Sequence, residues 1–189
     1  MDYKEKIQKY IEEEIEVVKT LDINVINEIM NEIKASQERG NIIYICGNGG
    51  SAATASHYCC DFNKGVSGNS DKDTNFICLS DNIATITAIG NDISYDEIFS
   101  YQLRNRIKPG DLLFVISGSG NSKNIVRAME VAKEKGNKII GLCGYSGGKV
   151  KEMSDICLHV NVNNMQIVED LHMMLDHCMM YILAYGGCC

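Results

Sequence analysis

Short apolar runs alternate with longer segments of helical periodicity from residue 41 onward. The apolar runs are rich in β-branched residues and predict strands at 41–46, 74–80, 111–116, 137–143 and 156–160. The segments between and after them predict helices at 51–62, 82–89, 94–107, 121–135, 147–153 and 165–184. This alternation favours a parallel sheet of five strands with helices on both faces, which is a doubly wound α/β fold.

The chain before residue 41 has a helical pattern throughout. From about Tyr3 to Glu38, lysines and glutamates separate isoleucines and valines at helical spacing. Asp22 and Asn24 interrupt this pattern and predict a break between two helices. An apolar stripe of this kind packs either against its own chain or against another subunit, and both interpretations stay open at this point.

Length and composition indicate one globular domain. The 189 residues are 45% hydrophobic and 23% charged, which is ordinary for a chain with a substantial core. The sequence shows no linker, repeat or low-complexity block. We therefore predict a single domain over 1–189, with a helical segment at 1–40 and the α/β core and last helix at 41–185.

Charge and cysteine usage restrict the partners and the compartment. A diffuse net charge of −7 argues against a nucleic-acid partner. The charged start at Met1–Lys6 does not suit a signal peptide, and no apolar run approaches the roughly 20 residues of a membrane span. Nine cysteines without a C-x-x-C pair are typical of free thiols in a reducing cytoplasm. Cys188 and Cys189 follow two glycines and are expected to form a loose tail.

Two glycine-serine turns carry most of the functional information. Cys46–Ser51 (CGNGGS) follows the first predicted strand, and Ser117–Ser122 (SGSGNS) follows the third. Each turn precedes a predicted helix, so its N–H groups and hydroxyls face the positive end of that helix, which binds anions and phosphate above all. Ligands in open α/β sheets bind at the carboxyl ends of the strands. We therefore predict that a phosphorylated ligand lies between the two turns.

Neither turn carries a nucleotide-binding signature. The P-loop requires G-x-x-x-x-G-K-[ST], and the dinucleotide fingerprint requires G-x-G-x-x-G with an acid about 20 positions later. Both patterns are missing from the two turns, so a nucleotide site is disfavoured.

The helix predicted at 51–62 carries a histidine and an acid on one face. His57 and Asp61 stand four residues apart, which places them side by side on a helix. The pair suits metal ligands, or a base with its partner, or a hydrogen-bonded histidine that only packs.

The last predicted helix carries a second set of polar residues, namely Gln166, Glu169, His172, Asp176 and His177. At 100° per residue, Glu169 and His177 lie about 80° apart and can face one cleft, while His172 points elsewhere. A solvated helix face explains the same spacing, so the pattern alone does not decide between the two.

Several motifs in order resemble the phosphoheptose isomerase branch of the sugar isomerase (SIS) domain family. They are Gly47–Ala53 with His57 four residues before an acid, Gly90–Asp92, Ser117–Ser122, Gly147–Lys149 and Glu169–His177. The resemblance spans almost the whole chain and implies a flavodoxin-like sandwich, usually a homotetramer with active sites between subunits. It implies the conversion of sedoheptulose 7-phosphate to D-glycero-D-manno-heptose 7-phosphate.

The resemblance also implies roles for residues at the matching positions. Phosphate or sugar hydroxyls would be bound by Ser51, Ser117, Gly118, Ser119 and Ser122. The sugar site would be lined by Asn48, Gly49, Gly50, Asn91, Asp92 and Glu169. The metal or catalytic set, which holds zinc in many members, would be His57, Asp61, Glu169 and His177.

Two positions depart from the family pattern. The family usually carries Glu where this chain has Asp61, and Gln where it has Glu169. The shorter Asp withdraws its carboxylate by about 1.5 Å, a displacement that can cost about 100-fold in rate. Our hypothesis is that Glu169 compensates, so that the carboxylate has moved from one helix to the other.

Isomerisation through an enediol needs a base for the C2 proton and an acid for the carbonyl oxygen. Asp61 or Glu169 is the expected base, Asp61, Glu169 and His177 together form the expected catalytic set, and His177 is the expected acid. Zinc held by the metal set would polarise the carbonyl group. Which carboxylate binds metal and which accepts the proton stays open.

Two other functions stay open beside this one. Some relatives of the branch are non-catalytic tetrameric scaffolds that bind a replication initiator protein, and others sense phosphosugars. The presence of the complete metal set favours an enzyme. The changes at Asp61 and Glu169 are compatible with an isomerase of another ketose phosphate or of an amino-sugar phosphate.

Overall fold

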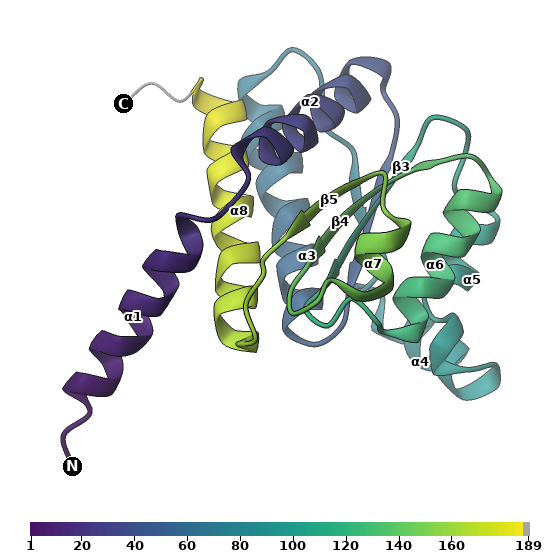
Figure 1. The fold of residues 1–189 in the computed structure, drawn as a ribbon. Helices are drawn as coiled ribbons and strands as arrows, with labels where there is room; N and C mark the ends of the chain where they lie inside the picture. The colour runs from purple at the N-terminus through teal and green to yellow at the C-terminus, as the bar shows by residue number, and fades with distance from the viewer. Residues whose placement is uncertain (187–189) are drawn as a thin grey trace.

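A central sheet is flanked by helices on both faces in the computed structural model, which describes residues 1–186 (Figure 1). Within this range the strands are β1 (Ile43–Gly47), β2 (Phe76–Cys78), β3 (Leu112–Ser117), β4 (Lys138–Cys143) and β5 (Ile156–His159). All neighbours pair in parallel, in the order β2-β1-β3-β4-β5. This is the flavodoxin-like doubly wound order, so the predicted fold class is confirmed. The predicted tail at Cys188 and Cys189 lies outside the described residues.

The helices follow the predicted pattern, with shifts at their ends. They are α1 (Lys4–Val18), α2 (Ile23–Arg39), α3 (Gly50–Cys60), α4 (Ile83–Asp92), α5 (Ser100–Arg104), α6 (Lys123–Glu134), α7 (Gly148–Met153) and α8 (Met165–Tyr185). Short turns of other helix types are η1 (Asp61–Val66), η2 (Ser67–Asn69) and η3 (Tyr95–Glu97).

Two of the predicted helices are interrupted. The helix predicted at 51–62 ends as an α-helix at Cys60 and continues as the π-helix η1, which begins with Asp61. The helix predicted at 94–107 is divided into the 3₁₀ turn η3 and the short α5. Wide turns of the π type are frequent at functional sites, and this one lies beside the candidate site described below.

Successive side chains of β1 point to opposite faces of the sheet, so they contribute in turn to two hydrophobic cores. Ile43 and Ile45 pack in the core beneath α2, α3 and α8, whereas Tyr44 and Cys46 pack in the core beneath α4 to α7. The two groups of helices lie on opposite sides of the sheet (Figure 1). The order of strands reverses between β1 and β3, and open α/β sheets bind ligands at the carboxyl end of such a switch point.

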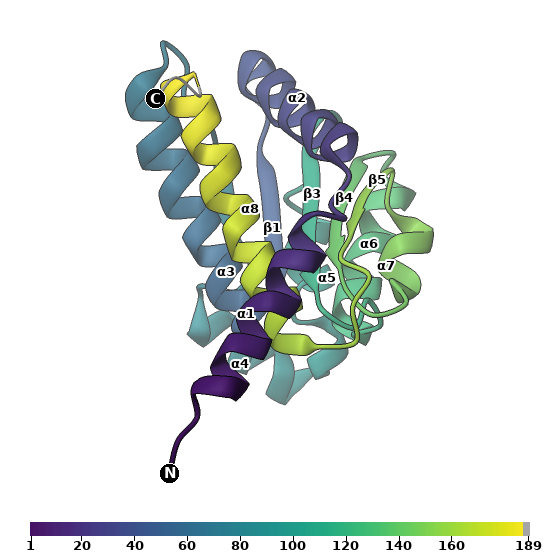
Figure 2. The same cartoon turned by 60° about the vertical axis from the view of Figure 1, so that its left-hand side comes forward.

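The first helix extends away from the body of the protein (Figure 1), and in the view turned by 60° it crosses in front of α8 (Figure 2). Asp22 caps α2 through its Oδ1, which accepts from Asn24 N–H at 2.9 Å, so the predicted break between the helices is present. Tyr10 and Val17 of α1 pack near the start of α8. The adjoining side of α1 leaves Ile7 56% and Ile11 44% exposed. The apolar stripe is therefore only partly covered by its own chain.

Candidate active site

The two glycine-serine turns meet at the carboxyl ends of β1 and β3. Gly47 at the end of β1 pairs with Ile116 of β3, which brings the turns side by side. Asn48 in the first turn exchanges two amide hydrogen bonds of 2.9 Å with Asn124 at the start of α6. Tyr95 also donates its hydroxyl to Asn48 Oδ1 at 3.1 Å. The Asn48 amide therefore fixes the first turn to the start of α6, the helix that follows the second turn, a role in addition to the sugar contact that the sequence predicts.

A cavity of about 180 Å³ opens between the turns. It is lined by Asn48, Ser51, Ile116, Ser117, Gly118, Ser119, Ser122, Met165 and Glu169. Ser122 is the N-cap residue of α6, and Ser51 lies in the first turn of α3, so the positive ends of two helices face this space. Hydroxyls and free N–H groups at helix starts suit a phosphate group. The structure thus brings together most of the residues predicted to bind substrate.

Glu169 reaches this cavity because residue 50 is a glycine. A Cβ atom on Gly50 would lie 2.6 Å from Glu169 Oε2 and 2.8 Å from Oε1. The carboxylate therefore occupies the space above the first residue of α3, where the helix dipole attracts a negative charge.

Replacing Gly50 with Ala is expected to displace the Glu169 carboxylate and lower kcat by about 10- to 100-fold, because a shift near 1 Å can cost that much. Ala is well tolerated at a helix start, so the melting temperature should hardly change. Gly68→Ala is the matched control, since a Cβ there meets no atom within 4 Å. Steady-state kinetics and thermal melts of both variants test this, and an unchanged kcat for Gly50→Ala would contradict it.

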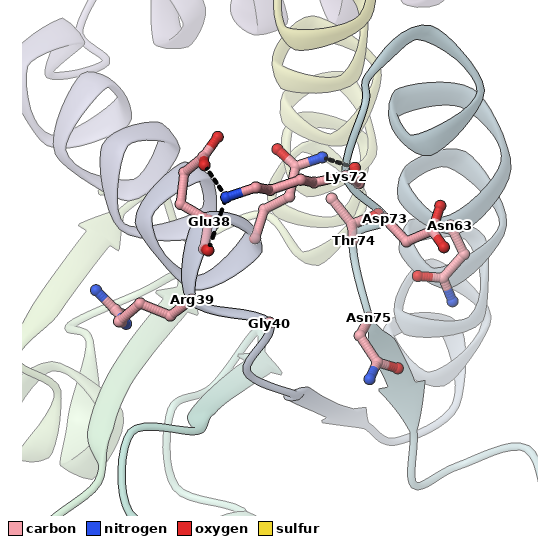
Figure 3. A pocket seen from close by; sticks show the side chains of 9 residues that line it. Glu38, Arg39, Gly40, Asn63, Lys72, Asp73, Thr74 and Asn75 are labelled. Atoms are coloured by element: carbon pink, nitrogen blue, oxygen red, sulfur yellow. Dashed lines mark hydrogen bonds and ion pairs between the residues drawn. The ribbon is translucent and has the colours of Figure 1, made fainter.

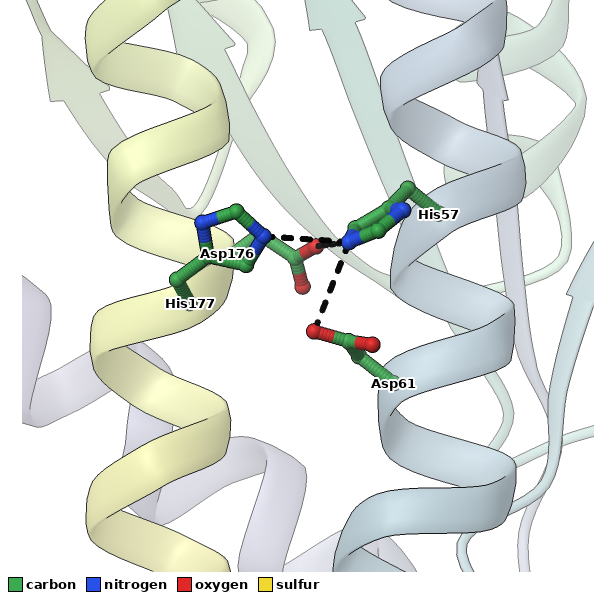
Figure 4. Close-up of side chains that lie close together, drawn as sticks. All are labelled: His57, Asp61, Asp176 and His177. Carbon is green, nitrogen blue, oxygen red and sulfur yellow. Dashed lines mark hydrogen bonds and ion pairs between the residues drawn. The ribbon is translucent and has the colours of Figure 1, made fainter.

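A second cluster of side chains lies between α3, η1 and α8 (Figure 4). His57 Nε2 lies 3.0 Å from His177 Nε2, 3.6 Å from Asp61 Oδ2 and 3.8 Å from Asp176 Oδ2. One ligand atom from each of these four residues lies within 4.8 Å of the others. Two imidazoles and two carboxylates at this spacing form a donor set that suits a divalent cation such as zinc.

Asp176 is the member of this cluster that sequence reasoning left without a role. Its side chain is 0% exposed, and burial together with the charge of Asp61 raises its pKa to about 8. The sequence contained one clue, because Asp176 stands directly after Leu175 and three residues before Met179, which are both core residues. An acid on the apolar side of a helix is worth inspection as a ligand or a catalytic group.

Glu169, Asn91 and Asp92 were also predicted to belong to the site, but they lie outside this four-residue cluster. Glu169 faces the cavity, and no oxygen of it belongs to the group of four ligand atoms found among residues 1–186. Asn91 and Asp92 are exposed at the end of α4, where Asn91 Nδ2 donates to Asp92 Oδ1 at 2.8 Å. Neither lines the cavity between the turns.

His172 is 1% exposed, and burial lowers its pKa to about 4 against a smaller opposing effect of the Cys143 backbone.

A larger cavity of about 750 Å³ lies at the opposite end of the sheet (Figure 3). Its walls come from the end of α2 and the segment before β2, and Lys72 Nζ crosses it to Glu38 Oε2 at 2.6 Å. Ligands in this fold class bind at the carboxyl ends of the strands, whereas this cavity lies at the amino ends. The smaller cavity is therefore the better candidate for an active site.

Comparison with known proteins identifies the family of this chain. The family model described as SIS domain matches residues 2–144. A phosphoheptose isomerase from Rhodospirillum rubrum is 38% identical over 152 residues, which is 80% of each chain. The solved phosphoheptose isomerase from Francisella tularensis has a TM-score of 0.89 at 31% identity, covering 97% of this chain and 99% of that one. The enzyme from Neisseria gonorrhoeae has a TM-score of 0.87 at 30% identity, covering 96% and 98%.

None of the helices in residues 1–186 combines the length and apolar character required to cross a bilayer.

Proposed function

We propose that this chain, which belongs to the SIS domain family and is a sugar phosphate isomerase, converts sedoheptulose 7-phosphate to D-glycero-D-manno-heptose 7-phosphate. The observation that carries the proposal is the cavity that joins the serine turns to a carboxylate and opens beside the helices that carry the His57 cluster. It combines a place for phosphate with groups that can move protons. A cytoplasmic location remains a prediction.

The substrate phosphate is placed at the Ser117–Ser122 turn. Ser117, Ser119 and Ser122 supply hydroxyls there, and the start of α6 supplies the positive end of a dipole. The sugar chain then runs along α3, from Ser51 at its start toward His57 near its end. This direction leads the carbonyl end of the sugar toward the histidines and acids.

Proton transfer is assigned to one group in the cavity and one group in the cluster. A base removes a proton from the carbon beside the carbonyl, and an acid protonates the carbonyl oxygen to give the enediol. Glu169 projects into the cavity and is assigned as the base. His177, which is exposed and shares the cluster with His57, is assigned as the acid.

The residues of the cluster fit the zinc that the sequence predicts, because nitrogen and carboxylate donors converge and Asp176 has a buried carboxylate among them. His57, Asp61 and His177 would hold the ion, as predicted for these three. When bound there, zinc would polarise the substrate carbonyl as a Lewis acid.

A proton NMR assay with sedoheptulose 7-phosphate, with and without zinc, tests the function. We expect the appearance of the aldose signals and exchange of a carbon-bound proton with D₂O. If no turnover occurs under either condition, the proposed reaction is excluded. Calorimetric binding of the sugar phosphate without turnover would then point to a sensor or scaffold, and turnover of another ketose phosphate would reassign the substrate.

We also propose a homo-oligomer, most simply the homotetramer that the sequence predicts. Replacing Ile11, an exposed apolar residue of α1, with Glu should shift the mass in solution toward the monomer, because a charge cannot be buried unpaired at an interface. Glu13→Gln, on the other side of the same helix, is the control. Light scattering after gel filtration measures the mass, and an oligomer that survives the Ile11 change would exclude this face as the contact.

A further inference from the structure

We propose that Asp176 is the fourth ligand of the metal site in this chain, and that Glu169 is thereby left free to act on the sugar. The inference rests on the proposed function, since it names the residues that divide the metal and proton-transfer roles of that same site. It departs from the prediction that Glu169 completes the ligand set with His57, Asp61 and His177.

The first argument is the spacing of the ligand atoms. Atoms held ~2.0–2.2 Å from a tetrahedral zinc lie about 3.3–3.6 Å from one another. His57 Nε2 lies 3.0 Å from His177 Nε2, 3.6 Å from Asp61 Oδ2 and 3.8 Å from Asp176 Oδ2. The cluster therefore already has nearly the dimensions of a four-coordinate site, and small side-chain movements suffice to complete it.

The second argument is the burial of Asp176. Its side chain is 0% exposed, and neither carboxylate oxygen has a hydrogen-bond partner within the described part of the chain. Buried polar groups are almost always hydrogen-bonded, paired or bound to a metal, because desolvation without a partner is costly. Asp176 points from α8 toward His57 (Figure 4). A cation at the cluster would supply the partner that its carboxylate lacks.

The third argument is the place of Glu169. Its carboxylate lies at Gly50, the first residue of α3, whereas His57 stands seven residues later on the same helix. Seven residues correspond to about 10 Å of rise. A carboxylate held over Gly50 therefore lies at a different level of the helix from the cluster. It lies instead beside the serines that line the sugar cavity.

Metal titration tests the assignment without relying on catalysis. Purified full-length protein, stripped of metal, is titrated with Co²⁺ while its visible d–d absorption is recorded, and zinc affinity follows from competition. Asp176→Asn removes the charge and keeps the volume. We expect its affinity for both ions to fall at least about 100-fold, the upper end of what loss of an outer-shell partner costs.

Two matched variants make the result specific. Glu169→Ala, which removes every donor atom at this position, should retain the wild-type Co²⁺ spectrum and an affinity within about threefold, because the Glu169 side chain lies outside the cluster. Asp170→Asn should do the same, because Asp170 is an exposed acid of α8 whose partner is Tyr10. The proposal is overturned if Glu169→Ala loses affinity about 100-fold or if Asp176→Asn keeps it.

If Asp176→Asn fails to fold, the Glu169→Ala variant still tests the assignment, since loss of its Co²⁺ binding would refute it. The outcome is also separate from that of the proposed function. Asp176-dependent binding without turnover of the heptose phosphate would refute the function and leave the ligand assignment intact. Turnover by a wild-type protein that binds no Co²⁺ or Zn²⁺ would refute the ligand assignment and leave the proposed function intact.

Discussion

Replacing Glu169 with Gln is expected to lower kcat by about 10³-fold, which lies within the range that one positioned general base contributes. Gln has nearly the same shape, and its side chain still fits above Gly50, but it cannot accept a proton from carbon. The KM for the sugar phosphate should therefore change little. Steady-state kinetics measure both constants, and exchange of the substrate proton with D₂O should slow in parallel with turnover.

Asp61→Asn is the informative comparison for this variant. Asp61 lies 3.6 Å from His57 Nε2 in the cluster, so its loss should weaken metal binding and should be recovered in part by excess zinc. The loss in Glu169→Gln should not respond to zinc. Equal activity of the two variants at every zinc concentration would refute the division of roles, including the hypothesis that a carboxylate has moved from one helix to the other.

The sequence was sufficient to predict the sheet and the two turns. Apolar runs such as 111–116 are bounded by glycine, serine or asparagine, and strands of this kind keep their boundaries because both faces are buried. The positions of Ser51 and Ser117 at one cavity follow from parallel pairing of β1 with β3, which places both carboxyl ends at one edge. These features depend on local pattern and on a general rule of topology.

The separate positions of Glu169, at the cavity, and Asp176, in the cluster, were not predictable from the pattern. Helical angles place Glu169 and His177 within one sector of α8, but the eight residues between them add about 12 Å of rise. Angle alone therefore overestimates how readily both reach one ion. The apolar residues beside Asp176 hint at its burial, but the burial itself depends on how α8 packs on α3.

The change from α-helix to π-helix at Asp61 was also not predictable from the sequence. Nothing in the residues around Cys60 and Asp61 distinguishes an α-helix from the π-helix that begins there, because no proline or glycine marks the change. Likewise, Asn91 and Asp92 belong to a motif that implies the sugar site, yet both are exposed and outside the cavity. Their role in lining the sugar site remains a prediction. It should be tested in the assembled oligomer, because the resemblance implies active sites between subunits.

Replacing Gly120 with Ala is expected to lower the free energy of unfolding by about 3 kcal/mol or more and to raise the KM for the sugar phosphate at least about tenfold. Gly120 lies in the second turn with φ +66°, and a Cβ there would overlap the carbonyl oxygen of Gly147. Its N–H donates to the Ser117 carbonyl at 3.0 Å, and its carbonyl accepts from Val150 N–H at 2.9 Å. Relief of the overlap must therefore move the turn that carries the phosphate-binding hydroxyls.

Gly136→Ala separates the cost of a left-handed backbone from the cost of the overlap with Gly147. Gly136 has φ +73°, close to that of Gly120, but a Cβ there meets no atom within 4 Å. Its substitution should cost only the about 1–2 kcal/mol of a left-handed residue and leave KM unchanged, since it lies at the far end of α6. Denaturant unfolding and steady-state kinetics compare the pair. Equal losses of stability with unchanged KM in both would mean that the contact between Gly120 and Gly147 does not hold the turn in place, and that the turn can move without loss of phosphate binding.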